Sequence, residues 1–319
     1  MIPDVSVVIS THNPDHNRLK RALQGVMTQT LPYEQWELVI VDNASTIPLN
    51  VADLNLHTRN KITLIREDRL GLSYGRLAGF NNSVGWILVF VDDDNILSPD
   101  YLLNSLSLFQ IRPRLGLGGG RCVPEWENAA PEPWVNESYG NLALRDLGDK
   151  EQLAWMTVPP VYPTCAPIGA GMIVRREAIR SWANDCVTGG VPTGRRGKEL
   201  TSGEDCDIVM SALRDGWAVG YFPELTLTHL IASSRVTSKY LGALNYGIAR
   251  SWVQVLARHG IYPWPSAARW SVPYRKARAY FRYRAWAGQA EYVRWRGACG
   301  QFDGRAAIEK TKEVSSART

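Results

Sequence analysis

Short apolar runs alternate with helical segments along the first third of this 319-residue chain, and this alternation restricts the fold more than any other feature. Runs rich in Val, Ile and Leu predict four buried strands, at residues 5–10, 36–41, 62–65 and 86–91. Residues 18–27 and 72–84 have helical spacing, and the second helix is expected to turn Val84 inward. The alternation predicts βαβ units around a mainly parallel sheet, which is an α/β fold.

The rest of the chain has a looser pattern. A helix is expected to run to residue 108, with Ser98 as its cap and Pro99 at its first helical position. Later elements are expected as a strand entering a glycine bend at 115–122, a strand or bend at 168–175, a helix at 204–213 and an extended segment at 217–230. Residues 125–149 are expected to form a long loop, and the glycine-rich residues 188–203 a mobile one.

The size and composition are those of an ordinary globular protein, with 45% hydrophobic and 21% charged residues. They exclude a disordered chain, a collagen, a coiled coil and a disulfide-dependent mini-protein. The five cysteines are scattered, which favours a reducing compartment. The chain starts without a signal-peptide pattern and has no window near the roughly 20 apolar residues of a membrane span. A cytoplasmic location is expected, with peripheral attachment to the inner face of the membrane left open.

The net charge of +5 is divided unevenly along the chain. Residues 1–234 have a net charge of −7, whereas residues 235–300 contain one acid, Glu291, and have a net charge of +11. The arginines of residues 275–282 share one helical face, and Tyr280, Tyr283, Ala287 and Ala290 are expected to form another. Residues 272–296 therefore suit an anionic membrane surface. The alternative is a helical subdomain that packs its aromatic side chains on the core, and no nucleic-acid partner is expected.

The strand at residues 86–91 ends in three consecutive carboxylates, Asp92, Asp93 and Asp94. Three adjacent negative charges repel one another, so a bound cation would stabilise them. Hard carboxylate oxygens suit Mg²⁺ or Mn²⁺, which fill their other positions from phosphate and water. A solvated acidic turn is the alternative. Because ligands bind at the carboxyl ends of parallel strands, a site is predicted here and at Asp42, which ends the second strand.

Five motifs occur in an order that resembles the family 2 glycosyltransferases of the GT-A fold: SVVISTHN, LVIVDNAS, GLSYGRLAG, VFVDDDN and GEDCDIVMSALRDGW. The resemblance covers roughly residues 4–232. It implies a Rossmann-like, mainly parallel sheet flanked by helices, with a nucleotide-sugar half at 1–115 and an acceptor half at 116–232. Residues 233–319 are expected to add a basic, aromatic helical extension and tail.

The resemblance also implies roles for residues on the donor side. The nucleotide base would be held by Thr11, Asn13 and Asp42. The ribose or diphosphate would contact Arg76, and the ribose would contact Asp92 or Asp93. The metal would be bound by Asp94, with His229 at a position where some relatives have a further metal ligand.

On the acceptor side the resemblance implies that Asp205 is the general base. Acceptor-side positions are expected at Glu204, Gly169, Ala170, Gly171 and Trp126. The chain lacks the customary Gly-Gly-Phe acceptor signature, so the motifs describe the nucleotide side more fully than the acceptor side.

These implied roles describe a metal-dependent, inverting hexosyltransferase that uses Mn²⁺ or Mg²⁺ and a nucleotide-diphosphate sugar. The acceptor is expected to be a glycan or a lipid-linked molecule, in polysaccharide or surface-glycan biosynthesis. Inversion needs one carboxylate base and one cation at the departing diphosphate. The alternatives are a sugar nucleotidyltransferase and a non-catalytic nucleotide- or membrane-binding protein. The donor base, the sugar and the linkage are not encoded in any motif.

Overall fold

The computed structural model describes residues 2–50, 54, 62–188, 194 and 200–316 of the chain. It divides into two compact units. The first comprises residues 1–125, 143–197 and 204–230, and the second comprises residues 126–142, 198–203 and 231–319. Most of the glycine-rich loop predicted at 188–203, including its basic sequence Arg195-Arg196-Gly197-Lys198, lies outside the described residues.

The parallel half of the central sheet is built from the strands that the sequence predicts. Its strands are β1 (Val5–Thr11), β2 (Trp36–Asn43), β3 (Ile62–Glu67) and β4 (Ile87–Val91). The order is β3-β2-β1-β4, and each neighbouring pair is parallel. Every residue of β2 and β4 is buried, as continuous apolar runs covered on both faces require.

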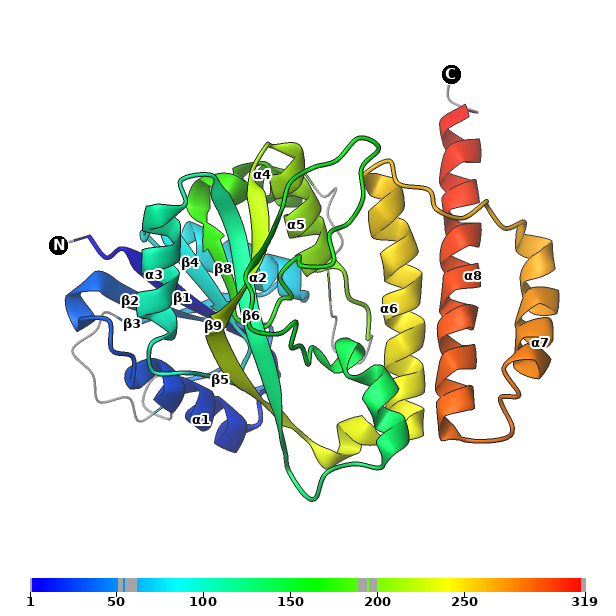
Figure 1. Cartoon of the computed structure of the whole chain (residues 1–319), viewed down its shortest axis with the longest axis horizontal. Coiled ribbons are helices and arrows are strands. Elements are labelled where there is room, and N and C mark those ends of the chain that lie inside the picture. Colours follow the sequence, from blue (N-terminus) through cyan, green and yellow to red (C-terminus); the bar gives the residue numbers. More distant parts are fainter. Residues whose placement is uncertain (1, 51–53, 55–61, 189–193, 195–199, 317–319) are drawn as a thin grey trace. The chain divides into compact units, whose positions relative to one another are not determined.

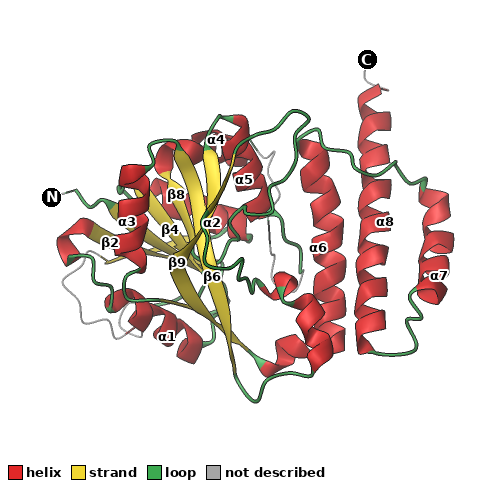
Figure 2. Cartoon of the chain, in the orientation of Figure 1, coloured by secondary structure: helices red, strands yellow, loops and turns green. Residues whose placement is uncertain are grey.

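The second half of the sheet is largely antiparallel. It contains β5 (Asn95–Leu97), β6 (Leu115–Trp126), β7 (Gln152–Ala154), β8 (Met172–Arg175) and β9 (Ala218–Ile231). The sheet continues from β4 through β8, β6 and β9, which are labelled in Figure 2, to β5. Strand β7 also pairs with β9. Strands β8 and β5 are antiparallel to their partners β4 and β9. The expected mainly parallel sheet is confirmed for the nucleotide-sugar half.

Helices cover the two faces of this sheet. They are α1 (His16–Met27), α2 (Leu72–Asn81), α3 (Tyr101–Ile111), α4 (Arg180–Val187) and α5 (Glu204–Arg214). The connections through α1 and α2 run across the sheet in opposite directions, so right-handed crossovers place them on opposite faces. Helices α2, α4 and α5 contact one another in that order. Asp15 caps α1, since its carboxylate accepts hydrogen bonds from the N–H groups of Asn17 and Arg18.

The second unit contains α6 (Ser238–Arg258), α7 (Val272–Arg282) and α8 (Gln289–Ser316). Helix α8 packs against both α6 and α7 and lies between them (Figure 1). Short 3-10 turns occur in both units, at Tyr33–Gln35, Pro133–Ser138, Gly140–Leu142, Arg176–Ile179, Ser233–Val236 and Arg269–Ser271. None of the helices that the structure describes is long and apolar enough to cross a bilayer.

Two helix boundaries differ from the prediction. Helix α2 ends at Asn81, so Val84 lies beyond it and is 52% exposed instead of facing inward. Helix α3 starts at Tyr101, because the N–H of Ser98 donates to the carbonyl oxygen of Thr226 in β9. Ser98 is therefore held by the sheet, and the predicted Ser98-Pro99 cap is wrong.

The predicted glycine bend at 115–122 is also wrong. Residues Leu115–Trp126 form one continuous strand, β6. A Cβ atom on Gly120 would lie 2.0 Å from the carbonyl oxygen of Leu225, so this glycine permits a close approach of β9. The predicted long loop at 125–149 contains 3-10 turns at Pro133–Ser138 and Gly140–Leu142.

The aromatic helical face expected from Tyr280 to Ala290 does not form. Helix α7 ends at Arg282, and Arg284 has a positive φ of 51°. Helix α8 then begins at Gln289, so the residues of the expected face belong to two helices and the turn between them. The chain reverses at this point because α7 packs back along α8.

Candidate active site

Predicted donor-side residues lie at one edge of the sheet, where β1, β2 and β4 end. Thr11 is the last residue of β1 and pairs in register with Asp42 of β2. Asp92 directly follows Val91, the last residue of β4, and β4 pairs with β1 through Ile9. The carboxyl ends of parallel strands form the edge at which α/β sheets bind ligands. The structure therefore brings these residues to the predicted edge.

The acidic cluster is tied to β1 through Asp93. The Thr11 hydroxyl donates a hydrogen bond to Oδ2 of Asp93. Burial, and then the negative charges of Asp94 and Asp92, raise the pKa of Asp93 to about 7, while the hydrogen bond from Thr11 acts in the opposite direction. The repulsion expected from three consecutive carboxylates is thus present at this edge, and a cation would relieve it.

The two predicted metal ligands, Asp94 and His229, lie side by side. Strand β5 pairs with β9 so that Asn95 is opposite His229. The N–H of Leu230 also donates to the carbonyl oxygen of Asp94, at 2.8 Å. As a result, Nε2 of the buried His229 is 3.2 Å from Oδ2 of Asp94.

This donor set fits a divalent cation that is shared with a phosphate ligand. A carboxylate oxygen suits Mg²⁺ and Mn²⁺, and an imidazole nitrogen is a ligand for first-row transition metals. The described residues contain no group of three or more His, Cys, Asp and Glu side chains that could hold a metal by themselves. A metal at Asp94 and His229 would therefore take its remaining ligands from phosphate oxygens and water.

Arg76 of α2 connects the acidic cluster with the start of α5. Its side chain is only 2% exposed, and its guanidinium lies over the ring of Phe90, 5.4 Å from the centroid. Nη2 is 4.0 Å from Oδ1 of Asp92 and donates to the carbonyl oxygen of Gly169 at 3.3 Å. Nη1 is 3.7 Å from Oε1 of Glu204. One buried cation thus joins residues from the predicted donor and acceptor sides.

Asp205, the predicted base, lies in the first turn of α5, where the helix dipole favours a carboxylate. The N–H of Gly169 donates to its Oδ2 at 3.1 Å, and the N–H of Cys206 donates to its Oδ1 at 2.8 Å. The hydroxyl of Tyr162 lies in the same environment. Burial, followed by the proximity of Cys206 and Asp205, raises the pKa of Tyr162 well above its usual value.

Asp42 orders the turn that follows β2. Its carboxylate accepts hydrogen bonds from the N–H groups of Ser45 at 3.0 Å and Leu49 at 3.1 Å. Nη1 of Arg66 forms an ion pair with Oδ2 at 2.9 Å. Burial by itself would raise the pKa of Asp42, but the hydrogen bonds and the charge of Arg66 outweigh it and hold the pKa below its usual value.

Asn13 links the segments that follow β1 and β2. Its N–H donates to Oγ of Ser45 at 2.9 Å, and its Oδ1 accepts from the N–H of Thr46 at 2.8 Å. Its positive φ of 50° is tolerated better by Asn than by most residues. Asn13 and Asp42 therefore share Ser45 as a partner, at the position expected for the nucleotide base.

Further residues shape this edge, and Asn43 is the clearest case. Its Nδ2 donates to the carbonyl oxygen of Arg69 at 2.8 Å, and its Oδ1 accepts from the N–H of Gly71 at 2.9 Å. It thereby fixes the turn that leads into α2. Its signal in the sequence is an Asn at the end of a strand, because Asn side chains hydrogen-bond local backbone. Arg66 and Tyr162 carry no comparable signal and were not singled out from the sequence.

The acceptor-side predictions are divided between the two units. Gly169, Ala170 and Gly171 form the turn before β8 in the first unit. Gly171 has a φ of +69°, and its carbonyl oxygen accepts from the Tyr101 hydroxyl at 2.5 Å. Trp126, in contrast, belongs to the second unit, where its ring lies 5.8 Å from that of Tyr139. The structure therefore gathers the glycine turn with Asp205 and leaves Trp126 in another unit.

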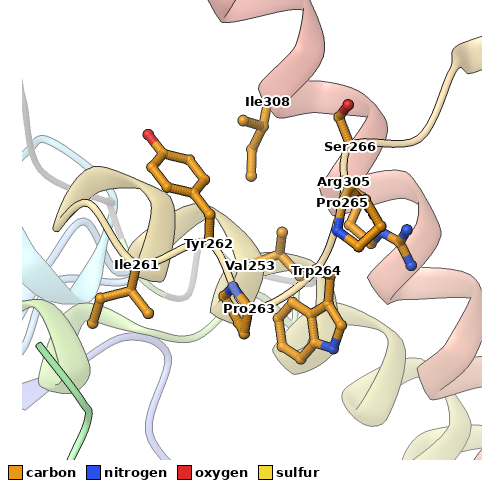
Figure 3. Close-up of a pocket in the computed structure, with 9 residues that line it drawn as sticks. All are labelled: Val253, Ile261, Tyr262, Pro263, Trp264, Pro265, Ser266, Arg305 and Ile308. Carbon is orange, nitrogen blue, oxygen red and sulfur yellow. Dashed lines mark hydrogen bonds between the residues drawn. The ribbon is translucent and has the colours of Figure 1, made fainter. Parts of the chain in front are cut away.

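A separate cavity of about 350 Å³ lies in the second unit (Figure 3). Val253, Trp264 and Arg305 are among its lining residues. None of the predicted site residues lines it, so it is distinct from the sheet edge.

Two family models match this chain. The model described as "Glycosyl transferase family 2" matches residues 6–152, and the model described as "Glycosyl transferase family group 2" matches residues 86–290, which is more than half of the chain. Together with the fold and the acidic sheet edge, these matches show that the chain belongs to the family 2 glycosyltransferases. The resemblance seen in the motifs is thereby confirmed, and the family is not that of the sugar nucleotidyltransferases.

Two curated relatives illustrate the similarity. The chain is 26% identical over 151 residues to "Glucosyl-dolichyl phosphate glucuronosyltransferase" of Haloferax volcanii, and this match covers 47% of this chain and 48% of the relative. It is 32% identical over 105 residues to "Succinoglycan biosynthesis protein ExoW" of Rhizobium meliloti, and this match covers 32% of this chain and 32% of the relative. The matched part of the chain thus spans half or less of the length of these relatives.

A solved structure extends the similarity of fold over nearly the whole chain. This is the mannosyltransferase PcManGT from Pyrobaculum calidifontis in complex with GDP-Man and Mn²⁺. The TM-score is 0.54 at 17% identity, and the match covers 99% of this chain and 81% of the other. At this identity the similarity concerns the fold, and it confirms the expected GT-A architecture.

Proposed function

We propose that this protein transfers a hexose from a nucleotide-diphosphate sugar to a glycan or lipid-linked acceptor, with inversion and in the presence of Mn²⁺ or Mg²⁺. The observation that carries the proposal is the network around Arg76. It joins Asp92 of the acidic cluster to Glu204 and, through Gly169, to Asp205. A donor site and a base are needed side by side for glycosyl transfer, and this network connects the candidates for both.

The donor would bind at the sheet edge. Thr11, Asn13 and Asp42 are proposed to hold the nucleotide base, and Asp92 and Asp93 the ribose. The proximity of these residues at the ends of β1, β2 and β4 supports this assignment. Arg76 is proposed to act on the ribose or diphosphate side by fixing Asp92, because its own side chain is 2% exposed.

Asp94 and His229 would hold the divalent cation. Their separation of 3.2 Å and their O and N donor atoms support this role. When bound, the cation neutralises the charge that develops on the departing nucleoside diphosphate. The complex of the mannosyltransferase PcManGT with GDP-Man and Mn²⁺ is consistent with such a requirement.

Asp205 is proposed to accept the proton of the acceptor hydroxyl. As that oxygen bonds to the anomeric carbon, the bond from this carbon to the diphosphate oxygen breaks, and its electron pair leaves with the diphosphate. The attack is on the face opposite the leaving group, which inverts the configuration. Backbone N–H groups of Gly169 and Cys206 donate hydrogen bonds to the carboxylate and orient it.

The acceptor would be recognised by Glu204 and the turn from Gly169 to Gly171. Trp126 belongs to the second unit, and its acceptor role stays a separate prediction. The names of the two curated relatives, a glucosyl-dolichyl phosphate glucuronosyltransferase and a succinoglycan biosynthesis protein, favour a lipid-linked or polysaccharide acceptor. They support a role in polysaccharide or surface-glycan biosynthesis.

The proposal is tested with a panel of nucleotide sugars and Mn²⁺, by measuring release of the nucleoside diphosphate with and without candidate glycan or lipid-linked acceptors. We expect one donor to be consumed. Asp205→Asn is expected to remove transfer, by at least about 100-fold in kcat, while donor binding is kept. Asp149→Asn, a change of the same kind at a 92% exposed carboxylate, is the matched control and should leave transfer unchanged.

The outcomes separate the proposal from the non-catalytic alternative. Donor binding without turnover for any pair would support a nucleotide-binding protein that lacks activity and would overturn the proposal. Equal loss of donor affinity and transfer in the Asp205→Asn variant would show that this residue binds the donor and is not the base.

A further inference from the structure

The second unit has an exposed surface that contains both arginine and aromatic side chains. We call it the α7 surface, and it consists of Arg269, Trp270, Tyr274, Arg278, Phe281, Arg282, Arg284 and Trp286. All eight side chains are exposed, and none belongs to the catalytic network. They lie on α7 and on the turns at either end of it, at the end of the row of helices formed by α6, α8 and α7 (Figure 1).

Contacts with α8 fix which side of α7 is turned inward. Ala279 is 5% exposed, and Lys276 forms an ion pair with Asp303 of α8 at 2.8 Å. The indole N–H of Trp295 in α8 donates to the carbonyl oxygen of Lys276 at 3.1 Å. The ring of Tyr280 packs edge-on against that of Trp295, with centroids 5.3 Å apart. These contacts occupy one face of the helix.

The outward face of α7 is amphipathic in an unusual way, because large apolar and charged side chains are exposed together. Tyr274, Ala277, Arg278 and Phe281 are all exposed and follow the i, i+3, i+4, i+7 spacing of a single helical face. Tyr274 is 69% and Phe281 67% exposed, whereas a soluble helix normally turns such residues inward.

Two tryptophans extend this face beyond the helix. Trp270 is 84% exposed in the turn before α7, and Trp286 is 56% exposed in the turn after it. Together with Tyr283, which is 36% exposed, five large aromatic side chains are therefore presented to the surroundings within 17 residues. Clustered exposed apolar side chains mark a surface that contacts a partner or a membrane.

The charge of the same surface is entirely positive. Residues 225–290 contain no Asp or Glu. Within the part of the chain that the structure describes, Arg269, Arg278, Arg282 and Arg284 form no ion pair, whereas Arg294 in the neighbouring helix pairs with Glu137. Unpaired arginines that surround exposed aromatic rings complement an anionic, amphipathic partner.

We propose that the α7 surface docks on an anionic lipid bilayer, with α7 lying in the plane of the interface. The aromatic rings would enter the boundary between headgroups and acyl chains, and the arginines would contact lipid phosphates. Basic residues near such a surface gain from its negative potential. The other occupants are a single-stranded nucleic acid, whose bases could stack on the rings, and a second copy of this chain, which would present the same positive charge; the test below distinguishes both from a bilayer.

The test uses the full-length protein and sedimentation with vesicles of phosphatidylcholine, with or without about one third phosphatidylglycerol. Binding is expected only with the anionic lipid and is expected to weaken as the salt rises from about 0.1 M to about 0.5 M. Arg278→Gln/Arg282→Gln is expected to lower the affinity about tenfold or more. Trp270→Ser/Phe281→Ser, which keeps the charge, is expected to lower it by a similar factor.

The matched control is Arg180→Gln/Arg214→Gln, which removes two exposed arginines from the first unit. It should bind vesicles like the unaltered protein, and circular dichroism should show that all variants keep their helices. Unchanged binding in both α7 variants, or equal losses in the control, would overturn the proposal. So would tighter binding to a single-stranded oligonucleotide than to the vesicles, or a dimer that depends on Trp270 and Phe281 in the absence of lipid.

Discussion

The buried ion pairs of Arg76 offer the sharpest test of the site. Arg76→Met keeps much of the side-chain volume but removes the cation between Asp92 and Glu204. Glu204, whose side chain is only 6% exposed, would then lose this neighbouring cation. Removing one partner of a buried ion pair is costly because the other charge stays buried without its neutralising neighbour.

The magnitude follows from the distances. At 3.7 Å, the Arg76–Glu204 separation, unit charges attract each other by about 4 kcal/mol at an effective dielectric constant of about 20. Loss of one partner of such a pair costs about 3–5 kcal/mol. Because both separations are near the limit for an ion pair, we expect the free energy of unfolding to fall by about 3 kcal/mol.

The assay is urea unfolding followed by tryptophan fluorescence and circular dichroism, in a double-mutant cycle with Glu204→Gln. The double variant Arg76→Met/Glu204→Gln should be more stable than the sum of the single changes predicts, by about 1–3 kcal/mol. Arg180→Met, at a 66% exposed arginine, is the control and should change stability by less than about 0.5 kcal/mol. A loss below about 1 kcal/mol for Arg76→Met, or additive effects in the cycle, would refute the reasoning.

Three further predictions concern the metal, the glycine turn and pH. Mn²⁺ with a nucleoside diphosphate should raise the free energy of unfolding by about 2.7 kcal/mol when the free ligand is present at about 100 times its dissociation constant, as measured by thermal unfolding. Asp94→Ala should abolish this gain. An unchanged gain in the variant would show that Asp94 does not bind the metal. Gly169→Ala should cost about 1–3 kcal/mol in urea unfolding, because the new Cβ would lie 2.5 Å from Nη2 of Arg76. Gly140→Ala, where the Cβ meets nothing within 4 Å, is its control, and equal effects would contradict the packing argument. The pKa of Asp42 is lowered in the folded state, so its charge stabilises the fold above about pH 4 and this contribution is lost as the pH falls below that value. Asp42→Asn should therefore be less stable than the unaltered protein at pH 7, and the difference in unfolding free energy should narrow below about pH 4; a constant difference would show that Asp42 is not stabilised as a carboxylate.

The nucleotide-sugar half could be predicted well because its signals are local. An apolar run such as residues 36–41 specifies a buried strand, although β2 itself continues through Asp42 to Asn43. Once the strands are parallel, the rule that ligands bind at their carboxyl ends locates the site without any knowledge of contacts. The structure places Asp94 beside His229, and their role as metal ligands stays a prediction.

The errors occurred where a distant segment decides the local structure. The glycines of residues 116–120 suggested a bend, but β9 approaches them so closely that a side chain would clash, and they form a strand instead. Ser98 looked like a helix cap, but its backbone N–H donates a hydrogen bond to the carbonyl oxygen of Thr226 in β9. Neither partner can be found from the residues nearby.

The sequence by itself determined the class of fold, the family and the acidic sheet edge, since these depend on periodicity and on motifs read along the chain. Only the tertiary structure decided that Arg76 is a buried link between Asp92 and Glu204 and that Arg278 and Phe281 share one exposed face. The physical reason is that burial and ion pairing depend on contacts between segments far apart in the chain. Arg76 and Gly169 are 93 residues apart, yet a single hydrogen bond between them joins the two sides of the site.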